Sequence, residues 1–153
     1  MQKKIIVGNV DITRLALRQL PSFFNNVEIT GAFWCHTNYL LSLEGGPTRV
    51  KKAYICSYNF LKTLSGAPTE VGTLGAKGGD FICSHNLIKS LEGAPTIVHG
   101  NFSCKENPKL VSLTGIPQVV YGDFSCQRTK GKFTEEQIRS VCDVKGRVFT
   151  GDE

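Results

Sequence analysis

The amino-acid sequence predicts a β-rich solenoid, in which short parallel strands stack turn upon turn. The first observation is a recurring block: an aromatic residue, any residue, Cys, two residues, Asn, any residue and Leu. The second is its spacing, because the five cysteines of the block are separated by 21, 27, 21 and 22 residues. The third is a half-block, Ser/Thr-Leu-x-Gly-x-Pro, which follows four of the cysteines. Repeats of this length bury their apolar face only by stacking on one another.

Each unit begins with an aromatic residue and a Cys that alternate with period two. The pairs are Phe33 and Cys35, Tyr54 and Cys56, Phe81 and Cys83, Phe102 and Cys104, and Phe124 and Cys126. This alternation predicts a short strand whose aromatic and thiol side chains both point inward. The Asn that follows is expected to turn inward and to hydrogen-bond backbone groups that the bend leaves unpaired.

The return side of each turn contains Gly-x-Pro. Gly favours turns, and Pro fixes φ and lacks an N–H, so the return segment cannot be a helix. We therefore expect it to be extended or polyproline-like, with a Val three residues after each Pro. The extra six residues between Cys56 and Cys83 fall near 73–78 and predict a Gly-rich loop at the strand edge. That loop is equally consistent with a binding edge and with a tolerated surface excursion.

The block resembles the leucine-rich repeat, whose Leu-x-Leu-x-x-Asn-x-Leu core is matched here with an aromatic residue and Cys in the first two apolar places. Its particular sequence, Ser-Leu-Glu-Gly-Ala-Pro followed by Val-x-Gly-Asp-Phe-x-Cys, is similar to a short repeat found in uncharacterised proteins of tailed bacteriophages. The resemblance covers residues 33–127 and implies a right-handed coil of six to seven short parallel strands. It is specific for the fold and nearly silent on function. The departures are Thr129 in place of the Asn and an added residue, Pro108, after Asn107.

The whole chain, 1–153, is expected to form one repeat domain. Residues 1–32 read as a degenerate repeat that caps one end, with Val27 as its later Val, and 33–132 are the five repeats. Residues 133–153 form the other cap, because Thr134-Glu-Glu-Gln137 is a capping box and predicts a helix at about 135–143. Cys142 is expected to be buried on that helix. A last strand is expected at 147–150.

Composition narrows the function classes. The net charge is +5, but basic and acidic residues are interspersed along the chain, whereas a nucleic-acid binder usually concentrates its charge in one stripe. We find no signal peptide and no apolar run of membrane-spanning length. Five cysteines at one repeat position indicate packing in a reducing compartment, the cytoplasm, which is the host cytoplasm for a phage-encoded protein.

An enzyme or a metal protein is disfavoured by the same pattern. The cysteines are expected to face inward, and the short Cys-x-x-Cys spacing typical of zinc sites is absent. We therefore expect no catalytic residues, no metal and no cofactor.

The outward strand positions give the candidate contact surface. Trp34, Ile55 and Ile82 are predicted to be neighbours in one solvent-facing column of a concave sheet, and exposed apolar patches usually mark contact sites. The alternatives are that such residues simply fit strands, or that the N-terminal segment covers Trp34. The predicted partner-binding residues are Trp34, His36, Ile55, Tyr58, Ile82, His85, Lys105 and Arg128.

The leading functional hypothesis is a non-enzymatic protein-binding module, monomeric or homodimeric. The resemblance to bacteriophage proteins implies a phage-encoded product that binds and modulates a host protein, as in counter-defence. The alternative is a nucleic-acid or nucleotide binder. It would use Lys105, Arg128, Lys130 and Lys132, with Trp34 or Tyr58 as stacking platforms.

Overall fold

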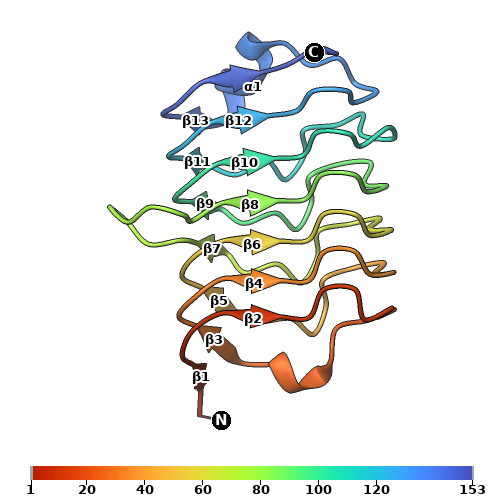
Figure 1. Ribbon diagram of the computed structural model, residues 1–153. Helices are drawn as coiled ribbons and strands as arrows, with labels where there is room; N and C mark the ends of the chain where they lie inside the picture. Colours follow the sequence, from red (N-terminus) through yellow and green to blue (C-terminus); the bar gives the residue numbers. More distant parts are fainter. Residues whose placement is uncertain (1, 153) are drawn as a thin grey trace.

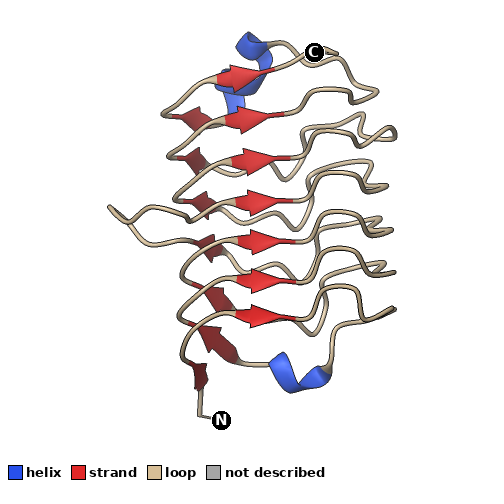
Figure 2. Ribbon diagram, viewed as in Figure 1, coloured by secondary structure: helices blue, strands red, loops and turns tan. Residues whose placement is uncertain are grey.

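The computed structural model describes residues 2–152 and forms a β-solenoid of about six turns (Figure 1). The turns stack into two parallel sheets of seven strands each, joined by loops, with two short helices near the ends (Figure 2). The predicted fold class is therefore confirmed. None of the helices in residues 2–152 has the length and hydropathy of a membrane span.

One sheet consists of the aromatic-x-Cys strands, which run in the same direction and in register. Its strands, in spatial order, are β2 (Val10–Asp11), β4 (Phe33–Trp34), β6 (Tyr54–Ile55), β8 (Phe81–Ile82), β10 (Phe102–Ser103), β12 (Phe124–Ser125) and β14 (Val148–Phe149). Both terminal strands occur where the sequence predicts a degenerate first turn and a last strand.

The return segments form a second sheet, which the sequence predicted only as extended chain. Its strands, in spatial order, are β1 (Lys4–Ile6), β3 (Val27–Ile29), β5 (Arg49–Val50), β7 (Glu70–Val71), β9 (Ile97–Val98), β11 (Val119–Val120) and β13 (Asp143–Val144). The Val after each Pro is the inward residue of this sheet. Ile29, not Val27, pairs with Val50, so the proposed role of Val27 is wrong by two residues.

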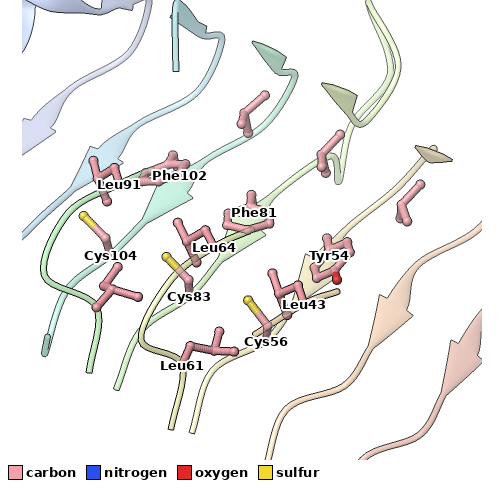
Figure 3. Packing of buried hydrophobic residues seen from close by; sticks show 14 of the residues in the cluster. Leu43, Tyr54, Cys56, Leu61, Leu64, Phe81, Cys83, Leu91, Phe102 and Cys104 are labelled. Carbon is pink, nitrogen blue, oxygen red and sulfur yellow. The ribbon is translucent and has the colours of Figure 1, made fainter. Parts of the chain in front are cut away.

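The core is a set of parallel rows, one residue from each turn. In Figure 3 the sulfurs of Cys56, Cys83 and Cys104 lie in line, beside a row of aromatic rings and a row of leucines. All five aromatic residues of the repeat are fully buried, and neighbouring rings lie 5.1 to 5.7 Å apart between centroids. The inward direction of the aromatic and Cys side chains is thus confirmed.

A ladder of buried asparagines ties each turn to the one before it. The Nδ2 of Asn59 donates to the carbonyls of Cys56 (3.0 Å) and of Cys35 in the preceding turn (3.2 Å). Its Oδ1 accepts the backbone N–H groups of Asn38 and Leu40. Asn38, Asn86 and Asn107 donate in the same way to their own and the preceding turn. At the last turn, Thr129 replaces one such bond by donating to the Cys126 carbonyl.

A second ladder explains the Gly-Asp and Gly-Asn pairs that precede the strands. The Oδ1 of Asp80 accepts the N–H of Asn101 at 2.8 Å, and the Oδ1 of Asn101 accepts the N–H of Asp123 at 2.8 Å. A Cβ on Gly100 would lie 2.3 Å from the Asp80 oxygen, so only glycine leaves room for it. The pairs are therefore a packing requirement.

Both open ends of the core are covered. At the N-terminal end, the 3-10 helix η1 (Ser22–Phe24) buries Phe24 against the ring of Phe33. At the other end, α1 (Glu135–Val141) inserts Ile138, and Thr134 and Gln137 form the predicted capping box. The helix is two residues shorter than predicted because Asp143 and Val144 join the second sheet as β13. Cys142 is buried as expected, but as the cap after the helix.

The insertion forms a loop that projects from the stack between β7 and β8, at the left of Figure 1. Residues 73–78 are all exposed, which confirms a Gly-rich surface loop. The two glycines at its root, Gly72 and Gly79, approach each other so closely that a Cβ on either would collide with the other.

Replacing Asn59 with Ala should lower the free energy of unfolding by about 3 kcal/mol. The change leaves several buried backbone carbonyls and amides without partners, each costing roughly 1–3 kcal/mol before relaxation. Urea denaturation followed by circular dichroism measures it. Asn25→Ala, an exposed asparagine, is the control and should change stability by less than about 0.5 kcal/mol. Equal effects of the two variants would contradict the ladder's role.

Replacing Tyr54 with Phe should raise the free energy of unfolding by about 1 kcal/mol. Its buried hydroxyl makes no hydrogen bond to any group of residues 2–152. The thiol of the nearby Cys35 belongs to a class of weak hydrogen-bonding groups and does not replace a full partner. Four of the five repeats already hold Phe at this position. A rise in melting temperature is expected, and a fall would show that the hydroxyl has a stabilising partner.

Candidate functional site

The column predicted as the contact surface exists. Trp34 pairs in register with Ile55, and Ile55 with Ile82, so the three side chains are neighbours on the outer face of the aromatic-x-Cys sheet. Each is half-buried, so the column is less open than expected. His36 is also half-buried and lies within 3.2 Å of the Thr37 hydroxyl.

Small residues on this face are covered. Ser57 and Ser84 occupy the same outward position in their repeats as His36 does in its own, but they are only 6% and 3% exposed. The Ser84 hydroxyl lies 2.9 Å from that of Ser103, which is also buried. A short side chain between larger neighbours is screened from water even when it points outward. The open part of the surface therefore lies elsewhere.

It lies on the bends that follow the strands, which stack at the right of Figure 1 and which we call the turn edge. The turn edge comprises residues 13–20, 36–43, 57–64, 84–91, 105–113 and 127–133. In each bend the residue before the Asn, or before Thr129, has a left-handed backbone. These residues are Thr37 (φ 60°), Tyr58 (55°), His85 (57°), Glu106 (60°) and Arg128 (57°).

This conformation is unfavourable for such side chains, by about 1–2 kcal/mol per residue. The asparagine ladder holds it, because the bend directs backbone carbonyls toward the Asn amide. Beside Asn59, for example, the carbonyl of Ser57 accepts at 3.3 Å. Backbone strain that the surrounding structure maintains is frequent at functional sites. Here it places one side chain from each of these turns in an outward column, and Tyr58, His85 and Arg128 are its largest members.

Aromatic side chains cluster on this edge. Tyr58 stacks on His85, with ring centroids 4.2 Å apart, and Tyr39 stacks on Phe60 at 5.8 Å. Tyr39, Tyr58 and Phe60 are 51%, 56% and 47% exposed, although each is large and apolar. Leu41, 53% exposed, lies beside them. Contiguous exposed apolar groups are frequent at contact surfaces.

The cluster lines two adjoining grooves. One, of about 520 Å³, is bordered by Tyr58, Phe60, His85, Leu87, Glu106 and Arg128. The other, of about 340 Å³, is bordered by Arg18, Tyr39, Leu41 and Phe60. Phe60 borders both, so the two grooves adjoin at its ring.

The predicted polar residues lie at one end of this edge. Arg128 forms an ion pair with Glu106, and its Nε donates to the Asp152 carbonyl at 3.1 Å. The guanidinium holds the pKa of the Glu106 carboxyl below its usual range, through a hydrogen bond and its charge. Lys105 is exposed nearby. Of the eight predicted residues, the structure thus brings Tyr58, His85 and Arg128 to one groove.

Tyr39, Leu41 and Phe60 were missed by sequence reasoning. The signal was present, because Tyr39, Phe60 and Leu87 are the variable residue of Asn-x-Leu in successive repeats. A residue between two inward positions must point outward. The sequence therefore predicts that this column faces solvent, as it does for the outward strand positions.

The second sheet carries a close polar cluster around His99 on its outer face. The Nε2 of His99 lies 2.6 Å from a carboxylate oxygen of Glu70, and the ring stacks on Tyr121 at 5.2 Å. Arg49 donates to the carbonyls of Glu70 and Gly72. These contacts join neighbouring turns beneath the root of the insertion, and we interpret them as structural.

The thiols of the repeat are poor nucleophiles. Burial raises the pKa of Cys126 to about 11, and that of Cys142 to about 11. It raises the pKa of the other four thiols further above the usual range. Three thiols donate to the backbone of the next turn, at 3.3 to 3.6 Å. Among residues 2–152, no three His, Cys, Asp or Glu side chains group as a metal site.

Comparisons with protein-family models, with curated proteins and with solved structures find no match to this chain.

All six thiols should resist a thiol-specific reagent at pH 8 until the protein unfolds. Because folding raises each thiol pKa, the folded state holds these protons more tightly than the unfolded chain does. Their contribution to stability should be complete below about pH 8.5 and should decline as the pH rises beyond it. Labelling kinetics and the urea midpoint at pH 7 and pH 10 measure both effects. Cys104→Val should reduce the pH dependence, and rapid labelling of the native protein would contradict the burial of the column.

Proposed function

We propose that this protein is a non-enzymatic binding module that holds a protein partner along its turn edge. The observation that carries the proposal is the exposed cluster of Tyr39, Leu41, Tyr58 and Phe60, which lines two adjoining grooves. Tyr is among the side chains that most often dominate binding energy at protein interfaces. The half-buried strip of Trp34, Ile55 and Ile82 would flank this contact.

A rigid backbone favours tight binding. The residues on either side of Asn59 are Tyr58 and Phe60, and the Asn59 side chain makes five hydrogen bonds to the backbone. Little conformational entropy is therefore lost when a partner docks, which leaves more of the contact energy for affinity.

The resemblance to repeats of tailed-bacteriophage proteins supports a narrower proposal. In it, the protein is phage-encoded, acts in the host cytoplasm, and modulates a host protein in counter-defence. An inert thiol column suits a reducing compartment, because buried cysteines need neither pairing nor protection there.

Nucleic acid is the alternative partner. Two of the four cations proposed for it are engaged within the protein: Arg128 pairs with Glu106, and Lys132 pairs with Asp152. Trp34, the proposed stacking platform, is half-buried. These contacts favour a protein partner.

The double variant Tyr39→Ala/Phe60→Ala should abolish partner binding while the protein stays folded. Each exposed aromatic anchor is expected to contribute on the order of 2 kcal/mol, or about 30-fold in Kd. The partner is captured on immobilised protein from the cell that expresses it, identified by mass spectrometry, purified, and titrated by calorimetry.

Two further variants locate the contact. Tyr58→Asn removes a ring but keeps a residue that tolerates left-handed backbone, so loss of binding without loss of stability is expected. Phe23→Ala removes a ring of similar exposure (58%) outside the turn edge and should bind normally. Undiminished binding by the Tyr39/Phe60 variant, together with loss on Trp34→Ala, would move the contact to the strand face.

A further inference from the structure

The charge of the chain is unevenly distributed once the chain has folded. The turn edge carries nine basic residues and one acidic residue, Glu106, for a net charge of +8. The remainder of the chain has nine basic and twelve acidic residues, a net charge of −3. The basic residues are Arg14, Arg18, Lys62, Lys89, Lys105, Lys109, Arg128, Lys130 and Lys132, and all nine are exposed. Basic and acidic residues that are interspersed along the sequence are thus separated in the fold, and the basic ones form a strip along the turn edge.

Few of these cations are neutralised within the protein. Of the nine, only Arg128 and Lys132 take part in ion pairs within residues 2–152, with Glu106 and Asp152. The other ion pairs of the described chain lie on the second sheet, the C-terminal cap and Asp123. The turn edge therefore presents a positive electrostatic potential to solvent, which favours an anionic partner.

The aromatic rings indicate which kind of anion. Tyr58 and His85 stack with ring centroids 4.2 Å apart, and Tyr39 and Phe60 are nearly parallel at 5.8 Å, with interplanar angles of 10° and 11°. One face of each ring is therefore directed at a neighbouring ring, whereas a base of a single strand needs an open ring face to stack on. The exposed aliphatic residues Leu41 and Val111 also suit a polypeptide.

We infer that the partner is an acidic polypeptide segment that also carries apolar side chains. Its carboxylates would lie over the basic strip, and its apolar residues would enter the grooves at Phe60. This inference rests on the proposed protein-binding function and specifies the chemistry of the partner.

The test uses the full-length protein and two purified probes: a random copolymer of Glu and Tyr, and an oligothymidylate of equal charge. Lys62→Glu/Lys89→Glu reverses two charges on the turn edge. Lys52→Glu/Lys77→Glu reverses two exposed lysines at the opposite edge, beside and within the insertion. Both variants lower the net charge from +5 to +1, so they differ only in where the charge is changed.

The copolymer should bind saturably, more weakly as salt rises, and about tenfold more weakly to the Lys62/Lys89 variant than to wild type. The Lys52/Lys77 variant should bind like wild type. Equal losses in the two variants would overturn the inference, since net charge alone would then account for binding. Absence of saturable binding would also overturn it, and tighter binding of oligothymidylate would assign the strip to nucleic acid.

The same variants separate this inference from the proposed function. A purified protein partner that loses binding with Tyr39→Ala/Phe60→Ala, but not with Lys62→Glu/Lys89→Glu, would leave the protein-binding function in place and overturn the acidic partner. A partner that is insensitive to both pairs of changes would overturn both.

Discussion

The bridging asparagine amide is the interaction on which this solenoid depends. A coil with two-residue strands leaves most of its backbone outside the sheets, and those buried carbonyls and amides need partners. Each Asn of the ladder supplies one side chain that donates to two successive turns. The same side chain satisfies the bend and ties it to the preceding turn.

The ladder also explains why the turn edge can be a surface for recognition. Its geometry requires a left-handed residue before each Asn, and most side chains disfavour that conformation. Glycine or a second Asn would be the relaxed choice, yet the chain places Tyr58, His85 and Arg128 there. The local cost is offset by the buried hydrogen bonds beneath, which hold these side chains on a hydrogen-bonded bend.

The repeated side chains of the core and those of the turn edge differ in burial and in charge. The thiols and aromatic rings of the repeat are sealed in the core, so their chemistry is that of small and flat apolar groups. The outer groups along the bends include exposed aromatic side chains and ammonium or guanidinium groups.

The sequence by itself determined the repeat, its register and the direction of its repeated side chains. Period two set Phe81 and Cys83 inward, the polar position of Asn86 required a bend, and the capping box placed α1. These features depend on neighbours a few residues away or on identical residues in the next turn. The second sheet was not foreseen, because two-residue strands such as Arg49–Val50 become strands only when the next turn pairs with them.

The tertiary structure decided which outward residues are open. Ser57 and Trp34 both point away from the core, but the first is covered and the second half-covered, because exposure depends on the size of neighbours from other turns. Likewise Tyr39 and Phe60 lie 21 residues apart in the sequence and stack only because the coil repeats at that interval. Charges that alternate along the chain gather on one edge for the same reason. Stacking brings residues at equivalent positions of successive turns together. The sequence shows which residues these are only when the register of every turn is known.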